Sequence, residues 1–75
     1  MKTVLVSEYD KIAQMCGPIN HARNEADAVR SFHRRHKDDP DAGDFALVKV
    51  GVFDTDTGEI EPSFPPEEIP LNKAE

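Results

Sequence analysis

Several residue types that build disulfide-bonded, membrane-spanning or catalytic proteins are scarce in this 75-residue chain. It has no tryptophan, one tyrosine and one cysteine. Because one cysteine cannot form an intrachain disulfide, the sequence favours a reducing compartment over secretion. No apolar run approaches the roughly 20 residues of a membrane span, and the run that follows Met1 is too short for a signal peptide. We therefore expect a soluble intracellular protein.

A catalytic constellation is also missing, so we expect neither an enzyme nor a bound cofactor. Four side chains are of types that bind zinc, but their spacing in the sequence does not match that of known zinc sites: Cys16, His21, His33 and His36. The tripeptide at residues 56–58 is that of aspartic proteases, but a second copy is absent. Residues 54–58 resemble the start of a calcium loop, but no glutamate stands at the twelfth position of that loop. Turn chemistry explains these residues without a metal.

The longest strand-forming run extends from Phe45 to Asp54. Its alternate positions 46, 48, 50 and 52 are all apolar, which predicts a central strand with that face on the core. Residues 54–58 then predict a hairpin loop, with Gly58 able to adopt a positive φ. The return strand is expected to begin at Ile60.

The remaining elements indicate an α+β domain. Residues 2–7 predict a strand, residues 9–16 an irregular segment, and residues 19–22 a short strand. A helix is expected over residues 25–37, with Asn24 as its N-cap and Pro40 beyond its end. We predict a three- or four-stranded, mainly antiparallel sheet with one helix packed on one face. This domain would span residues 1–61, followed by an extended proline-rich acidic tail over residues 62–75.

Charge is divided unevenly along the chain, whose net charge is −6. Residues 1–37 hold seven Lys and Arg against four Asp and Glu, whereas residues 38–75 hold two against eleven. An acidic total argues against non-specific coating of nucleic acid. A local basic site is still compatible with it, and one is predicted on and beside the helix: Arg23, Arg30, His33, Arg34, Arg35 and Lys37. The alternative is an ordinary solvated helix face.

The face of the central strand opposite the predicted core carries Phe45, Leu47 and Phe53. One short helix cannot cover both faces of a sheet, so these residues predict a self-association surface and a two-fold homodimer. The rival explanation is that the tail folds back and covers this face with Phe64 and Ile69.

The order of short motifs resembles a known viral family. The motifs are Asp10-Lys11, Gly17-Pro18, Ala28-Val29-Arg30-Ser31-Phe32, Asp44-Phe45-Ala46-Leu47 and Gly51-Val52-Phe53-Asp54 followed by Thr57-Gly58-Glu59. Over residues 9–60 they resemble the small nonstructural, fifth-reading-frame protein of gokushovirus-like Microviridae, which are phages with single-stranded DNA. The resemblance implies a non-virion protein in the cytoplasm of the host bacterium. Arg30 is the only basic residue that the match carries over.

Together these observations predict an accessory protein that contacts DNA, most simply single-stranded DNA, through a basic helix during genome replication or packaging. The alternative function belongs to another class. It is an acidic protein–protein adaptor that holds a basic phage or host replication or packaging protein.

Overall fold

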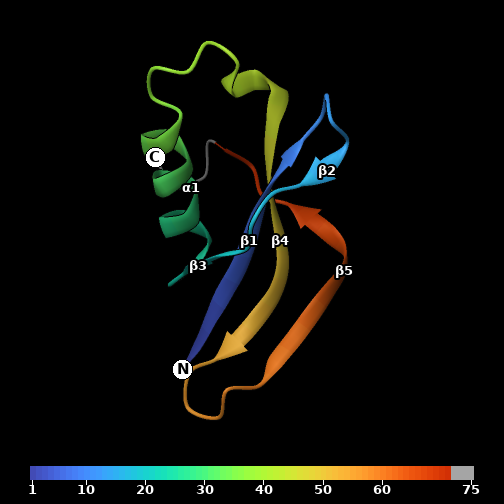
Figure 1. Ribbon diagram of the computed structural model, residues 1–75. Coiled ribbons are helices and arrows are strands. Elements are labelled where there is room, and N and C mark those ends of the chain that lie inside the picture. The colour runs from blue at the N-terminus through green and yellow to red at the C-terminus, as the bar shows by residue number, and fades with distance from the viewer. Residues whose placement is uncertain (72–75) are drawn as a thin grey trace.

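The computed structural model describes residues 1–71, which form an antiparallel sheet with one helix beside it (Figure 1). The strands are β1 (Lys2–Asp10), β2 (Met15–Cys16), β3 (Asn20–Ala22), β4 (Phe45–Asp54) and β5 (Ile60–Glu68). The helices are α1 (Glu25–Arg35) and the short 3-10 helix η1 (Ala42–Asp44). The sheet order is β2-β1-β4-β5, and β3 also pairs with β1. Within the described residues, no helix is long and apolar enough to cross a membrane.

The predicted α+β class, with a mainly antiparallel sheet and one α-helix, is confirmed. The sheet has five strands rather than three or four because the segment expected to be irregular turns back and pairs. Its turn follows Asp10, whose carboxylate accepts hydrogen bonds from the N–H groups of Ile12 and Ala13 at 2.9 and 3.1 Å. The first strand therefore continues to Asp10 instead of ending at Ser7.

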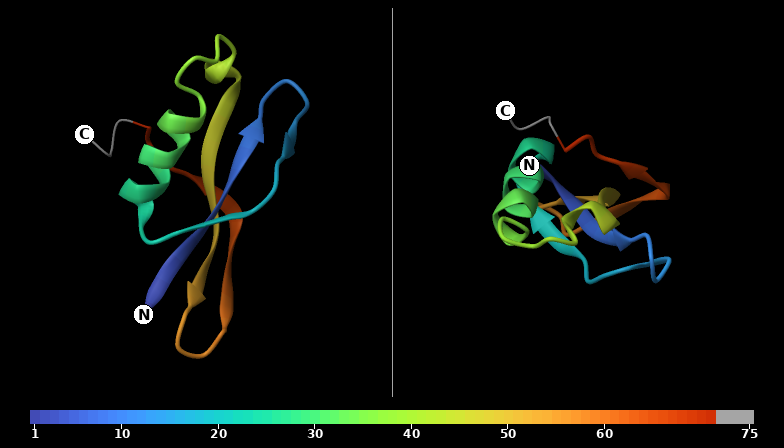
Figure 2. Two further views of the ribbon diagram at one scale, coloured as in Figure 1. Left: turned by 60° about the vertical axis from the view of Figure 1, so that its left-hand side comes forward. Right: turned by 90° about the horizontal axis from the view of Figure 1, so that it is seen from above.

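The core lies between the sheet and α1, which covers one face (Figure 2). The helix contributes Ala28, Val29 and Phe32, at the helical spacing that predicted a buried face. The sheet and the chain after it contribute the other buried members: Val6, Ala22, Leu47 and Ile69. The apolar periodicity of α1 therefore identified the side of the helix that packs on the sheet.

In the first half of β4 the predicted core face is buried, at Ala46 (7% exposed) and Val48 (8%), but α1 covers the opposite face. Leu47 is 0% exposed and belongs to the core, with Phe45 packed against it. The cause is a register shift: Leu5 pairs with Gly51 whereas Val6 pairs with Lys49, so residue 50 has no partner on β1. An extra residue of this kind exchanges the two faces of a strand beyond it. Strict alternation through residues 46–52 therefore does not describe one face.

The same shift separates the residues of the predicted self-association surface. Phe53 pairs with Thr3 and its ring meets His21 edge-on at 5.9 Å, on the side of the sheet away from Leu47. Because Leu47 is buried and Phe53 lies on the other face, these residues and Phe45 do not form one exposed patch. The surface on which the homodimer prediction rested is thus not present.

The proline-rich segment is joined to the sheet as far as the structure describes it. β5 pairs with β4 at both of its ends and continues past the boundary predicted at residue 61. Ile69 is 2% exposed in the core, and its N–H donates to the carbonyl of Leu47 at 2.8 Å. Phe64, in contrast, is 90% exposed. Ile69 therefore covers Leu47 as the rival explanation expected, and Phe64 does not; residues 72–75 of the predicted tail lie outside the described residues.

Candidate nucleic-acid interface

Helix α1 is stabilised by local interactions that fix its start. The side chain of Asn24 accepts a hydrogen bond from the N–H of Asp27 at 2.8 Å, as expected of an N-cap. Glu25 and Asp27 occupy the first turn, and basic side chains occupy the last turn. This order of charges is favourable in the field of the helix dipole. The predicted start of the helix is confirmed, whereas the helix ends at Arg35, two residues earlier than expected.

Three of the predicted DNA-contacting cations are exposed and form no ion pair with any described residue. Arg30 and Arg34 lie one turn apart on α1, and Lys37 lies in the turn that follows the helix. We call these three residues the basic helix surface. Because no carboxylate among residues 1–71 neutralises them, their charges are available to an external anion.

The other predicted contacts are engaged within the chain. Arg23 forms an ion pair with Asp27, 3.6 Å from Nε to the carboxylate. His33 Nε2 lies 2.6 Å from the carbonyl oxygen of Leu71. Arg35 binds Glu8 of β1, with Nε 2.6 Å from Oε2. These residues are exposed, but their polar groups already have partners, so they contribute less to anion binding than the basic helix surface.

Beside this surface, His36 connects α1 to the sheet. Its ring nitrogens lie 2.8 Å from Glu8 Oε1 and 3.0 Å from Asp39 Oδ2. The ring also stands between two phenylalanines, with centroids 4.4 Å from Phe32 and 5.1 Å from Phe45. The side chain is 11% exposed. His36 is therefore a structural contact between helix and sheet rather than part of the DNA-contacting surface.

The pKa values of these groups favour a charged network. The hydrogen bonds that His36 donates to Glu8 and then to Asp39 raise the pKa of His36 above its ordinary value. Burial pushes the pKa of Glu8 upward, but the hydrogen bonds from His36 and Arg35 outweigh it and hold that pKa below its ordinary value. The hydrogen bond from His36 likewise lowers the pKa of Asp39. Each ionised member thus favours the ionised form of the next.

This network was not predicted from the sequence. Glu8 lies 27 and 28 residues from its partners on and beside α1, and a spacing of that size carries no periodic signal. Charge patterning could have indicated only that the basic end of the helix would attract acids. The pairing depends on the continuation of β1 to Asp10, which carries Glu8 to the end of α1.

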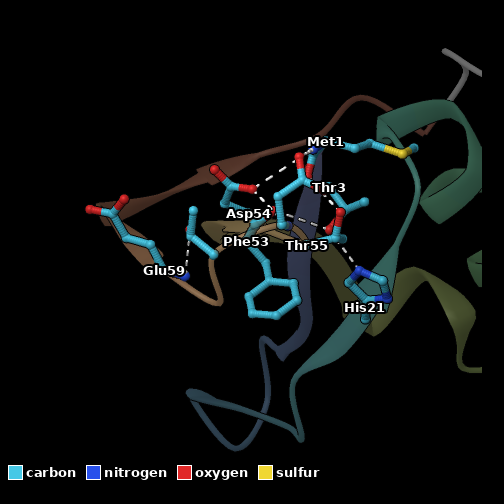
Figure 3. Close-up of polar contacts among 9 residues, drawn as sticks. Met1, Thr3, His21, Phe53, Asp54, Thr55 and Glu59 are labelled. Carbon is cyan, nitrogen blue, oxygen red and sulfur yellow. Dashed lines mark hydrogen bonds and ion pairs between the residues drawn. The ribbon is translucent and has the colours of Figure 1, made fainter.

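The histidines and Cys16 considered for a zinc site are not brought together. His21 Nε2 lies 2.6 Å from the hydroxyl of Thr3 (Figure 3), whereas His36 is held by Glu8 and Asp39. Among residues 1–71 there is no group of three histidine, cysteine or acidic side chains suited to a metal ion.

Residues 54–58 form a turn closed by their own groups. The carboxylate of Asp54 accepts from the N–H of Asp56 at 2.9 Å, and the N–H of Gly58 donates to the carbonyl of Asp54 at 2.8 Å. Gly58 has a φ of 81°, as its place in the predicted turn requires. The Met1 ammonium lies 3.7 Å from Asp54 and 2.5 Å from Asp56, and Figure 3 shows it beside Asp54. The side chains that partly match a calcium-loop pattern thus stabilise the local turn.

Comparison with known families decides the class of protein. A family model described as phage ORF5 protein matches residues 3–74. The chain belongs to this family. The phage ORF5 match covers nearly the whole chain and confirms a phage protein, the coarser part of the resemblance drawn from the motifs. No curated protein and no solved structure matches the chain.

Proposed function

We propose that this phage ORF5 protein is a non-virion accessory protein of a single-stranded DNA phage of the Microviridae. In the host cytoplasm it would contact DNA through α1 during genome replication or packaging. The observation that carries the proposal is the basic helix surface, whose three cations are exposed and unpaired with the described residues. Phosphate groups are the anions that such a surface would meet on DNA.

The charge of the whole chain limits the strength and mode of this contact. With a net charge of −6, the chain repels a polyanion except where its basic residues approach it. Three phosphate contacts to a single strand correspond to a log–log salt dependence with a slope of about −2. We therefore expect weak, local and strongly salt-dependent binding. Aromatic stacking is not part of the contact, since the basic helix surface contains no aromatic side chain.

A salt titration with a labelled single-stranded oligonucleotide tests the proposal. The double variant Arg30→Glu, Arg34→Glu should abolish binding, since it replaces two attractive charges by two repulsive ones. Its matched control is Lys2→Glu, Lys11→Glu, which makes the same change in net charge at exposed positions on β1 and in the hairpin turn. The control should retain most of the affinity. Equal losses in both variants would show that only net charge matters.

Failure to bind at low salt would remove DNA contact and leave the adaptor as the better proposal. That function would use carboxylates of the acidic second half of the chain to hold a basic protein. The two functions also differ in response to the reversed helix charges. An adaptor that binds a basic partner would keep or increase its affinity in Arg30→Glu, Arg34→Glu, whereas a DNA-contacting protein would lose it.

A further inference from the structure

The hairpin of β1 and β2, and the link from β2 to β3, expose large apolar side chains. Ile12 is 76% exposed, Met15 62% and Ile19 64%, all within eight residues. A domain with so small a core would gain stability by burying them, yet the hairpin lies on the side of the molecule away from α1 (Figure 2). Grouped apolar side chains of this kind mark interaction surfaces more often than isolated ones do.

Beside these side chains the surface is hollowed. One hollow, of about 420 Å³, is lined by apolar groups of Ala13, Met15, Pro18 and Phe45, with Arg35 and Glu8 at its α1 side. A second, of about 380 Å³, is lined by Ile12 and four aspartates. The linings of the two hollows share Asp10 and Phe45, and we call the two hollows together the hairpin groove. Each hollow has a volume in the range of sites that hold a few side chains of a ligand.

The rim of the hairpin groove is acidic. The four aspartates of the second hollow are Asp10, Asp39, Asp41 and Asp44. Asp39 is bonded to His36, but the other three make no ion pair with any residue among 1–71. The nearby cations are Arg35, which is bound by Glu8, and Lys11, whose Nζ lies 3.3 Å from the carbonyl of Gly43. The groove therefore combines apolar walls with a lining in which acidic side chains outnumber basic ones.

This combination selects one kind of occupant. Nucleic acid and anionic membrane surfaces would be repelled by the aspartates. A second copy of the chain could offer its exposed Phe64, but that residue is flanked on β5 by Glu61, Glu67 and Glu68. A segment that carries both apolar and basic side chains satisfies the walls and the rim together.

We propose that the hairpin groove is a docking site for a basic, apolar segment of a partner protein. Apolar side chains of the segment pack on Met15, Ile12 and Phe45, and its Lys or Arg side chains reach the rim aspartates. The site is separate from the basic helix surface, and the proposal does not rest on DNA binding. Each can be tested while the other is left intact.

Selection of short peptides from a random display library, with the purified chain as bait, tests the docking site. Recovered peptides should be rich in Lys or Arg together with apolar residues. They should bind at least about tenfold more weakly to two double variants of the chain. The first, Ile12→Ser with Met15→Ser, alters the apolar walls of the groove. The second, Asp41→Asn with Asp44→Asn, alters its acidic rim. The matched control is Ile60→Ser, Glu61→Gln, which makes both changes on exposed β5 residues. It should bind as the unaltered chain does.

A chemical readout locates the bound peptide. Cys16 is exposed, lines the groove and is the only cysteine of the chain, so thiol alkylation reports on this surface alone. A recovered peptide should slow that alkylation in the unaltered chain and in Arg30→Glu, Arg34→Glu. A melting curve for each variant shows that it is folded.

Several results would overturn the proposal. They are no enrichment over the starting library, enrichment of acidic peptides, or binding that survives both groove variants. A change in oligomeric mass confined to the groove variants would identify a second copy as the occupant. Binding to anionic vesicles that is lost in Ile12→Ser, Met15→Ser would identify a membrane instead.

Discussion

The substitution His36→Phe isolates the polar contacts that His36 makes between α1 and β1. A phenylalanine ring can keep the stacking on Phe32 and Phe45, which lie 4.4 and 5.1 Å away. It cannot replace the hydrogen bonds to Glu8 and Asp39. Glu8 would keep Arg35 as a partner, so its carboxylate is not left without a counter-charge. The variant should therefore fold, at reduced stability.

The size of the loss follows from the two hydrogen bonds. A hydrogen bond to a charged group contributes about 1.5 to 3 kcal/mol. The two share one ring and are not additive, and Asp39 is partly screened because 33% of its side chain is exposed. We expect His36→Phe to lower the free energy of unfolding by about 2 to 4 kcal/mol at pH 6. For a domain of this size that corresponds to a fall in Tm of roughly 10 to 25 °C.

The pH dependence has a definite sign. Because the pKa of His36 is raised by folding, its stabilisation is fully present below its ordinary pKa of 6.5 and is lost as pH rises through the folded-state pKa. The lowered pKa of Glu8 acts in the opposite sense. Its contribution is present above its ordinary pKa of 4.5 and is lost as pH falls through the folded-state pKa. The network is therefore strongest between about pH 4.5 and 6.5.

Urea unfolding over about pH 5 to 9 measures this contribution. The unaltered chain should lose stability above pH 6.5, whereas His36→Phe should lose much less over the same interval. The control is His33→Gln, which removes an exposed histidine but leaves the contacts of His36 with Glu8 and Asp39 in place. The same pH slope in His36→Phe as in the unaltered chain would refute the assignment.

Two further predictions concern the turn after β4 and the segment after β5. Gly58→Val should lower the free energy of unfolding in urea by roughly 1 to 3 kcal/mol, because a β-branched residue is strained at the φ of 81° found there. Asp56→Asn should have little effect, since its ion pair with Met1 is exposed. A calcium-induced rise in Tm would contradict a purely structural turn. Ile69→Ala should destabilise by about 2 to 4 kcal/mol and Phe64→Ala by almost nothing, because Ile69 is buried against the core and Phe64 is exposed. Equal effects would show that the two residues do not differ in burial.

The parts of the fold that can be predicted from the sequence are those determined by neighbouring residues. The bounds of β4, the start of α1 and the glycine of the turn all rest on neighbouring residues, and all three agree with the structure. The register shift at residue 50 has one local signal, Gly51, because a glycine inside a strand often marks a bulge, but that signal does not say which strand face packs on the helix. That one extra residue exchanged the two faces of β4, so Leu47 lies on the side that α1 covers and Phe53 on the other side, and the two do not share the exposed face that the alternation predicted.

The candidate site also has a part that the sequence predicts and a part that it does not. The cations of α1 could be identified from a single helical segment, and those at Arg30 and Arg34 are exposed as expected. Which cations are neutralised depends on partners that only the folded chain brings near, such as Glu8 beside Arg35. The hairpin groove was missed for a related reason. A segment expected to be irregular gave no basis for placing Met15 near Phe45.

Arg35 follows Arg34 of the basic helix surface in the sequence and lines the hairpin groove. Its bond to Glu8 keeps this cation from neutralising the rim aspartates. Among residues 1–71, the cations of the basic helix surface and the groove carboxylates Asp10, Asp41 and Asp44 make no ion pair, so charges of opposite sign face outward from two places on one small domain. DNA on the first surface and a basic segment in the second would attract each other as well as the chain. Both proposals together thus predict that each ligand strengthens the binding of the other, which neither surface alone would produce.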